Sequence, residues 1–230
     1  MGVEVYEVLG GNWHRWQKDK KIRIMKIWEK YKKFLLTGEW HIHTNYTDGK
    51  NSVFEICEIA EKLKIPLIAF TEHVRKKLEY DFDSLLNDIK EAKEKYNNLI
   101  ILSGCEAKVL SDGSLNVDKK ILKKVDYPTF AFHSFPYEDV EVCREVIKKI
   151  IKNKYINTWV HPATFLNKVC LKKEETEELF ELLKKYKVLF ELNRKYKLDN
   201  RYVSFLKKYS SLLVRGNDIH SIYDMLKYEK

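Results

Sequence analysis

Short apolar runs alternate with segments of helical periodicity along most of the chain, and this alternation predicts a parallel sheet built from βα units. Seven runs have the length and composition of strands: 39–43, 67–71, 99–106, 129–133, 156–161, 188–192 and 212–216. Helical patterns occupy 52–64, 82–96, 118–124, 138–153, 172–186 and 199–209. The 194 residues after residue 36 of the 230-residue chain allow about 28 per unit, too few for eight units. We therefore predict an α/β fold, a distorted (β/α)7 barrel.

No glycine-rich phosphate loop follows any of these strands, which argues against a dinucleotide-binding, doubly wound sheet. The chain also has no run of about 18 apolar residues, so we expect no transmembrane helix and no membrane partner. Its first residues lack a basic segment followed by an apolar one, so we expect a cytoplasmic protein. The four widely spaced cysteines are expected to be buried apolar residues rather than disulfides.

Residues 1–36 are predicted to be an extension that is distinct from a barrel at 37–230. This stretch has nine Lys or Arg against four acidic residues, a net +5 of the chain's +9. Over 16–36, Ile24, Trp28, Tyr31 and Leu35 recur at helical spacing. We predict an amphipathic helix that plugs or flanks the barrel. The alternative is a basic arm that follows a nucleic-acid backbone, which we favour less because charge runs usually form solvated faces.

Histidine placement gives the strongest functional signal. Six of the seven histidines lie at or just after the carboxyl ends of predicted strands: His41, His43, His73, His133, His161 and His220. His41 and His43 share one face of their strand because side chains alternate, and Asp218 shares a face with His220 for the same reason. Glu106 ends another strand, and Asp48 lies in the Thr-Asp-Gly turn after His43. In a parallel barrel all these ends open onto one face.

Each of these residues alone has a structural explanation, such as a hydrogen-bonded core histidine or an aspartate in a turn. Together, nine such side chains at one barrel mouth would be costly to desolvate unless cations lay among them. We therefore predict a site for divalent metal ions. Mixed imidazole and carboxylate ligands favour the transition metals Zn2+, Mn2+ or Fe2+. The predicted metal ligands are His41, His43, Asp48, His73, Glu106, His133, His161, Asp218 and His220.

These motifs, in this order, resemble the polymerase-and-histidinol-phosphatase (PHP) family over roughly residues 38–221. The resemblance rests on His41-Ile-His43, Thr47-Asp48-Gly49, Thr71-Glu72-His73, Gly104-Cys-Glu106, His133, His161-Pro162 and Gly216-Asn-Asp218-Ile-His220. It implies a distorted (β/α)7 barrel with a cluster of usually three metal ions at its carboxyl-end face and, in most members, phosphoester hydrolysis.

The resemblance also implies how the ligands divide among the ions. One ion would take His41, His43, Glu106 and Asp218; a second would share Glu106 and add His133 and His161; a third would take Asp48, His73 and His220. The chain departs from the family at Glu72 and Glu39, where aspartate is frequent. Neither position is a ligand in this assignment, and we expect Glu72 to point away from His73.

The expected catalytic core is His41, His43, Glu106, Asp218 and His220, with a metal-activated hydroxide attacking phosphorus. Arg75, Arg194 and Arg215 lie close to the motifs and are candidates for binding a substrate phosphate, since a guanidinium matches its geometry. An ordinary surface ion pair is the alternative role for each of the three.

The leading prediction is a metal-dependent phosphatase for a small phosphomonoester, histidinol phosphate or a nucleotide among the candidates. One alternative is an exonuclease, in either the 3'-5' or the 5'-3' direction, that trims DNA or RNA ends, so a nucleic-acid partner stays open. The other is a non-catalytic metal-binding module, which is disfavoured because no ligand is missing. The sequence leaves the oligomeric state undecided.

Overall fold

Parallel strands form the centre of the computed structural model, which describes residues 25–228. The strands are β1 (Glu39–Ile42), β2 (Leu67–Phe70), β3 (His73–Val74), β4 (Ile100–Lys108), β5 (Tyr127–Ala131), β6 (Thr158–Trp159), β7 (Leu189–Leu192) and β8 (Leu213–Arg215). Their order is β1-β2-β4-β5-β6-β7-β8, and β3 pairs with β4 beyond the end of β2. All seven predicted strands are present, and β3 is an additional short one.

The sheet curves until its two edge strands lie next to each other. The segment just after β8 joins the end of β1, because His43 N–H donates to the Ile219 carbonyl (2.8 Å) and Ile219 N–H to the His41 carbonyl (3.0 Å). Nearer the other end, Arg215 N–H donates to the Leu35 carbonyl (2.8 Å). These bonds nearly close the sheet, so the predicted seven-stranded, TIM-like α/β barrel is confirmed.

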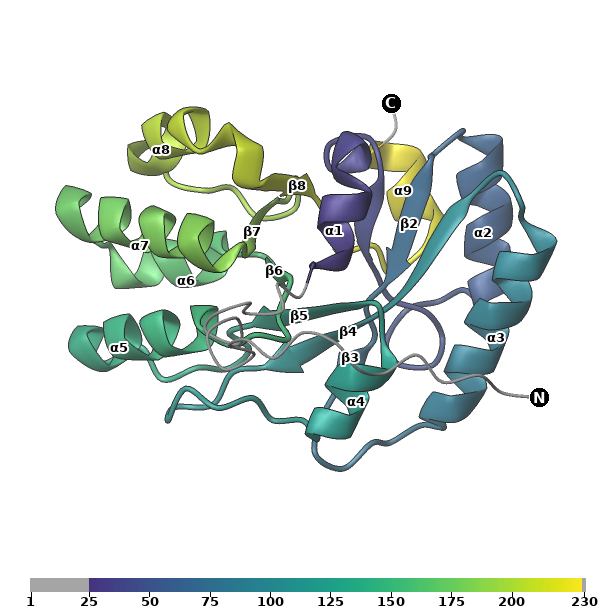
Figure 1. The fold of residues 1–230 in the computed structure, drawn as a ribbon, viewed down its shortest axis with the longest axis horizontal. Coiled ribbons are helices and arrows are strands. Elements are labelled where there is room, and N and C mark those ends of the chain that lie inside the picture. The colour runs from purple at the N-terminus through teal and green to yellow at the C-terminus, as the bar shows by residue number, and fades with distance from the viewer. Residues whose placement is uncertain (1–24, 229–230) are drawn as a thin grey trace, which may run out of the picture.

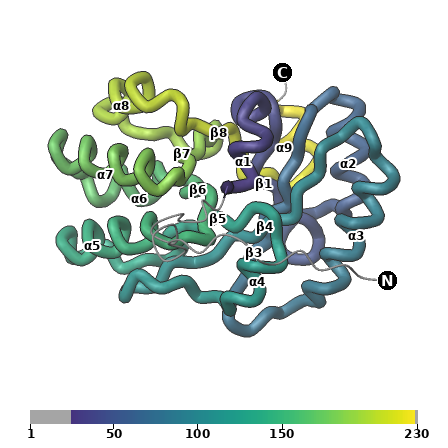
Figure 2. The backbone as a smooth tube through the Cα atoms, viewed as in Figure 1, coloured from purple at the N-terminus to yellow at the C-terminus, as the bar shows by residue number. Residues whose placement is uncertain are grey.

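Helices cover the outside of the barrel (Figure 1). They are α2 (Val53–Lys62), α3 (Phe82–Lys95), α4 (Lys119–Lys124), α5 (Val140–Ile151), α6 (Ala163–Val169), α7 (Lys173–Tyr186), α8 (Val203–Lys208) and α9 (Ile222–Tyr228). The carboxyl-terminal α9 lies beside α2 (Figure 2). Sequence reasoning did not expect α6 and α9, each of which is seven residues long.

The buried apolar residues form two groups on opposite faces of the sheet. The larger one lies between strands and helices and includes Ile68, Phe130 and Phe190 with Ile56 and Leu179. The smaller one, which we call the barrel floor, lies at the amino ends of the strands and consists of Leu35, Trp40, Leu67, Ala69, Leu102, Tyr127, Leu189 and Val214. Because side chains alternate along a strand, residues farther along the same inward rows point towards the carboxyl-end mouth.

The segment before β1 packs against the barrel floor. Ile27, Trp28, Tyr31 and Phe34 contact the floor residues, and the Trp28 indole N–H donates to the Lys187 carbonyl (3.1 Å). This is the packing expected of a segment that plugs the barrel. The prediction of one helix ending at Leu36 is wrong in the described part, however, because α1 (Ile27–Lys30) ends at Tyr31 and a 3-10 turn, η2 (Lys32–Phe34), follows. Its predicted beginning at residue 16 lies outside the described residues.

In a 3-10 turn the side chains of residues three apart lie directly above one another, so Tyr31 and Phe34 both face the floor. In a continued α-helix the same two side chains would be offset around the helix axis. Gly38 N–H then bonds to the Phe34 carbonyl (2.7 Å), and the chain enters β1. The division of the chain at residues 36 and 37 stays a prediction. Between residues 25 and 228, no helix has the length and apolar character that crossing a membrane requires.

Three of the four cysteines, Cys57, Cys105 and Cys143, are buried free thiols, as predicted for small apolar residues. Cys170 is exposed instead, because it ends α6 in a left-handed conformation (φ 52°) where the chain leaves the core.

The capping box of Ser52 and Glu55 begins α2: Ser52 N–H donates to Glu55 Oε2 (2.8 Å), and Glu55 N–H donates to Ser52 Oγ (3.3 Å).

The floor packing predicts different effects for two adjacent leucines. Leu35 is buried in the floor, whereas the Leu36 side chain is 56% exposed. Leu35→Ala should lower the free energy of unfolding by about 2–3 kcal/mol, because it removes a buried side chain and leaves a cavity. Leu36→Ala should change it by less than about 0.5 kcal/mol. Chemical denaturation of both variants measures the difference; equal effects would contradict the floor packing.

Candidate metal centre

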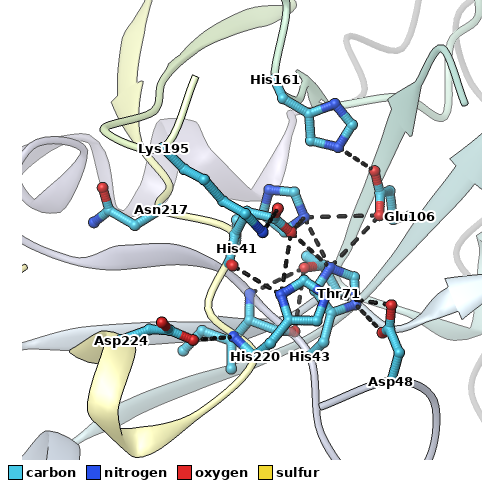
Figure 3. A network of polar contacts seen from close by, with 12 residues as sticks. His41, His43, Asp48, Thr71, Glu106, His161, Lys195, Asn217, His220 and Asp224 are labelled. Carbon is cyan, nitrogen blue, oxygen red and sulfur yellow. Dashed lines mark hydrogen bonds and ion pairs between the residues drawn. The ribbon is translucent and has the colours of Figure 1, made fainter. Parts of the chain in front are cut away.

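All nine predicted ligands meet at the carboxyl ends of the strands. His41 belongs to β1 and His43 follows it; Asp48 lies in the loop before α2, His73 in β3 and Glu106 in β4. His133 follows β5, His161 follows β6, and Asp218 and His220 follow β8. Figure 3 shows several of these side chains pointing towards one another from different parts of the chain. We call these nine residues the ligand cluster.

Glu106 lies in the middle of the cluster and is fully buried. Its Oε1 is 2.8 Å from the Nε2 atoms of both His133 and His161. Its Oε2 is 2.9 Å from His73 Nδ1, and 3.6 and 3.7 Å from the Nε2 atoms of His43 and His41. One carboxylate thus faces five imidazoles, an arrangement suited to bridging two cations.

The two imidazoles of the His-x-His motif face each other across the mouth. His41 Nε2 and His43 Nε2 are 3.0 Å apart, which confirms that the two rings share one face of the chain. Asp218 Oδ1 lies 3.6 Å from the first nitrogen and 3.4 Å from the second. Two nitrogens and carboxylate oxygens therefore converge on one small volume.

Asp48 gathers the outer part of the cluster. Its Oδ2 is 3.2 Å from His73 Nε2 and 3.3 Å from His220 Nε2, and its Oδ1 is 3.8 Å from His43 Nδ1. The Asp48 side chain is 52% exposed, so this side of the cluster opens to solvent, whereas His41, His43 and Glu106 are closed off.

Three groups of donor atoms lie close enough together to hold an ion each. They are His43, Asp48, His73 and His220; His41, His43 and Glu106; and His73, Glu106 and His133. The group of four contains Asp48, His73 and His220, the whole set that the family resemblance implied for the third ion. The group of His41, His43 and Glu106 lacks only Asp218 of the set implied for the first ion. His43 and His73 each belong to two groups, so the division of ligands among ions stays a prediction.

The donor atoms themselves indicate that cations belong in this cluster. Among the described residues, four buried cluster atoms form no well-directed hydrogen bond: His43 Nδ1, His73 Nδ1, Glu106 Oε2 and His161 Nδ1, although the second and third of these lie 2.9 Å apart. Leaving such atoms without a partner is costly, and divalent cations would satisfy those that face the mouth. The mixed imidazole and carboxylate set fits borderline transition metals better than Ca2+ or Mg2+.

Charge interactions within the cluster are strong. Burial opposes protonation of His41, but the Glu191, Glu106 and Asp218 carboxylates outweigh it and raise the pKa of His41 well above its usual range. Burial lowers the pKa of His43 to about 4, with the neighbouring His41 and His73 adding to the effect. The imidazoles hold the pKa values of Glu106 and Asp218 below their usual range although burial opposes this. The carboxylates of the cluster therefore require positive charge beside them.

Sequence reasoning missed Glu191, which orients His41 from behind. Glu191 Oε1 is 2.6 Å from His41 Nδ1, and its Oε2 accepts from the backbone N–H of His161. Gly216 makes room for it, since a Cβ there would lie 2.2 Å from Glu191 Oε1. A carboxylate behind a ligating imidazole fixes its tautomer and orientation. The available signal was that 188–192 was the one predicted strand to which no metal ligand had been assigned.

Lys195 and Tyr196 also escaped the sequence reasoning. Lys195 Nζ donates to Asp218 Oδ2 (2.8 Å) and the Tyr196 hydroxyl to the same oxygen (3.1 Å), so Asp218 Oδ1 is left facing the histidines.

Asp218 (φ 55°) and His161 (φ 32°) both have left-handed backbones, which are strained for residues other than glycine. Such strain is concentrated at functional sites.

The two departures from the family pattern, Glu72 and Glu39, support the cluster from outside. Glu72 is buried and accepts from Thr44 N–H (2.7 Å) and from the Thr47 hydroxyl, which ties the loop that carries Asp48 to the barrel. Burial raises the pKa of Glu72 to about 7, although both threonine hydrogen bonds oppose this. Glu39 accepts from the backbone N–H (2.8 Å) and side-chain amide (2.6 Å) of Asn217. Neither carboxylate contacts the ligand atoms.

Of the three candidate phosphate-binding arginines, only Arg75 lines the cavity that adjoins the cluster. Arg215 instead donates to the Gly38 carbonyl (2.7 Å) and the Thr37 carbonyl (3.0 Å) at the start of β1. Arg194 donates to the Tyr228 carbonyl. Both line a different cavity of about 360 Å³, to which no cluster residue contributes. Arg215 lies away from the cluster because it belongs to β8 itself and its side chain reaches the residues just before β1 rather than the mouth.

Comparison with known proteins assigns this arrangement to a family. The model of the PHP domain matches residues 39–196. The chain is 25% identical over 197 residues to the DNA polymerase/3'-5' exonuclease PolX of Bacillus subtilis (strain 168), covering 81% of this chain but only 35% of that protein. It is 24% identical over 204 residues to an Aliivibrio fischeri (strain MJ11) protein assigned as a phosphatase, covering 83% of this chain and 80% of that protein.

The fold matches a crystal structure of a Listeria monocytogenes protein assigned as a histidinol phosphatase, with a TM-score of 0.63 and 16% identity. The match covers 81% of this chain and 96% of that one, and shows that the two share a fold. The family model spans more than half of the chain and every strand from β1 to β7. The chain therefore belongs to the PHP domain family.

Proposed function

We propose that this protein is a phosphatase that hydrolyses a small phosphomonoester. The observation that carries the proposal is the cavity of about 460 Å³ that adjoins the ligand cluster, with Asp48, His73 and Arg75 in its wall. A cavity of this size suits a small molecule. The relative assigned as a phosphatase, which this chain covers over most of its length, supports the same substrate class.

The ligand cluster would hold two or three divalent ions, with His41, His43, Glu106, Asp218 and His220 as the catalytic core. When bound, such ions lower the pKa of water to produce a nucleophile and neutralise phosphoryl oxygens. Glu191 holds the His41 ring, while Lys195 and Tyr196 hold Asp218 with one oxygen directed at the histidines. The chain's own contribution is thus to keep the donors in place in a largely buried site.

An exonuclease is the second candidate. It is favoured by the likeness to PolX, which is named as a DNA polymerase and 3'-5' exonuclease, and by the net +5 of residues 1–36. The chain spans about a third of the length of that polymerase. The size of the cavity, about 460 Å³, favours the monoesterase, since it suits a small molecule. The complete set of nine ligands disfavours a non-catalytic module.

Glu106→Gln should lower kcat for release of phosphate from 4-nitrophenyl phosphate, with Mn2+ added, by more than about a hundredfold. Loss of groups that merely support a metal ligand costs 10–100-fold, and Glu106 is central to the cluster itself. Metal content, measured by mass spectrometry, should fall in parallel while the circular dichroism spectrum is unchanged. Glu94→Gln, at an exposed position on α3, is the matched control. Near wild-type hydrolysis by Glu106→Gln would refute the proposal.

Glu191→Gln should weaken metal binding by about 10–100-fold, because the amide cannot hold His41 as a carboxylate does. Competition with a chelator measures the affinity. Activity should return in part at saturating metal, since Glu191 does not contact the ligand atoms that face the mouth. An unchanged affinity would mean that the 2.6 Å contact with His41 has no role in positioning.

Removal of residues 1–24 separates the two enzyme proposals. It leaves intact the segment of residues 26–36 that packs on the floor, which a longer truncation would remove. If the protein is a monoesterase, kcat/KM for 4-nitrophenyl phosphate should stay within about twofold, since the nine cluster residues and the residues that line the cavity all remain in the shortened chain. The exonuclease would be favoured by two results together. The full chain would cleave labelled single-stranded DNA or RNA faster than it hydrolyses the monoester, and the truncation would selectively reduce the cleavage of the strand.

A further inference from the structure

The cavity beside the ligand cluster has a wall with its own chemistry. It is lined on one side by Tyr46, Thr47 and Asp48, and on the other by His73 and by Arg75, Lys77, Leu78, Glu79 and Tyr80 of the loop between β3 and α3. Glu79 is exposed to solvent and forms no ion pair with Arg75 or Lys77. Of the lining residues, only Asp48 and His73 belong to the cluster. The remaining residues can contact the part of a substrate that does not react.

Two cations of this wall have no carboxylate partner. Arg75 is half-buried, and its Nη1 donates to the Val74 carbonyl (2.8 Å), but no acidic side chain in the described part of the chain pairs with it. By contrast, the guanidinium of Arg144 pairs with Glu141 and Glu175, and that of Arg201 with Asp199. Lys77 also forms no ion pair within residues 25–228. Since a guanidinium has five N–H donors, Arg75 retains most of its capacity for an anionic oxygen.

The same cavity has an aromatic side. The rings of Tyr46 and Tyr80 are 6.1 Å apart between centroids, and Leu78 lies in the same wall. The Tyr46 hydroxyl donates to Asp88 Oδ2 (2.9 Å), which holds this ring in place. A flat or apolar group therefore has a surface to pack on next to the two cations.

We infer that the cavity binds the leaving group of a phosphomonoester that carries a second anionic group, and that Arg75 and Lys77 bind this second anion. The inference rests on the proposed phosphatase function and specifies its substrate class. In the cluster, bound divalent ions would neutralise the reacting phosphate, so the unpaired side-chain cations are left for another charge. Either a carboxylate or a phosphate supplies the chemistry that a guanidinium recognises.

The test uses the Mn2+-loaded full chain with three phenyl phosphates that differ in their para substituent. These are 4-carboxyphenyl phosphate, its neutral counterpart 4-carbamoylphenyl phosphate, and 1,4-phenylene bisphosphate. The variants are Arg75→Gln and Lys77→Gln. Lys76→Gln is the matched control, because Lys76 is an exposed lysine of the same loop that does not line the cavity.

In the wild type, kcat/KM should be at least about tenfold higher for the carboxylate or the bisphosphate than for the carboxamide, mainly through KM. Arg75→Gln should bring this ratio to within about threefold of one, Lys77→Gln should reduce it in part, and Lys76→Gln should keep it. A ratio of about ten or more for either charged substrate over the carboxamide supports the inference. The charged substrate with the larger ratio identifies the second anionic group as a carboxylate or a phosphate.

Calorimetry with hydrolysis-resistant 4-carboxybenzylphosphonate and its carboxamide gives a readout independent of turnover, and the Kd values should show the same pattern. A wild-type ratio near one, or an equal loss on charged and neutral substrates in Arg75→Gln, overturns the inference. The second result would mean that Arg75 grips the reacting phosphate. Absence of hydrolysis with an intact, Arg75-dependent binding preference would overturn the phosphatase function and support the anion site.

Discussion

The structure depends on the burial of one carboxylate among five imidazoles. Glu106 has no exposed surface, and the five rings that face it come from β1, β3 and the segments after β1, β5 and β6. Burying so many ionisable groups together is unfavourable unless their charges are balanced. Much else in the barrel reads as a response to this constraint: Glu191 holds a ring from behind, Lys195 and Tyr196 hold a second carboxylate, and the floor isolates the cluster from solvent at the other end.

β4 shows in one strand how the barrel separates stability from chemistry. Leu102 and Glu106 are four residues apart, so they point into the barrel from the same row. Leu102 packs in the floor, where burial of apolar surface stabilises the fold, and Glu106 lies at the mouth, where it meets the histidines. Gly104 lies between them, and a Cβ there would come within 2.7 Å of the Phe70 carbonyl. The neighbouring strands can therefore approach closely just below the cluster.

The fold and the gathering of ligands were predictable because both follow from periodicity. Alternation along β1 placed His41 and His43 on one face, and the parallel sheet placed every strand end at one mouth. Other features depend on contacts between distant residues and left no local pattern. Glu191 is recognisable only once the closed barrel brings its carboxylate to His41 of β1, and Arg215 is seen to lie near the floor only once its backbone N–H bonds to the Leu35 carbonyl. The break at Tyr31 is likewise imposed by packing against the floor, which overrides helical periodicity.

The cavity wall has a consequence for how related enzymes diverge. Its side chains outside the cluster belong mostly to one stretch, from Arg75 to Tyr80, between β3 and α3. This stretch contributes nothing to the floor, whereas the loop that carries Asp48 is anchored separately through Thr44 and Thr47 to Glu72. Replacement of a single short loop could thus redirect such a barrel to a different ester while its reactive centre stayed as it is. Selection would find new substrates there at little cost to folding, because loops tolerate exchange far better than the strands that they connect.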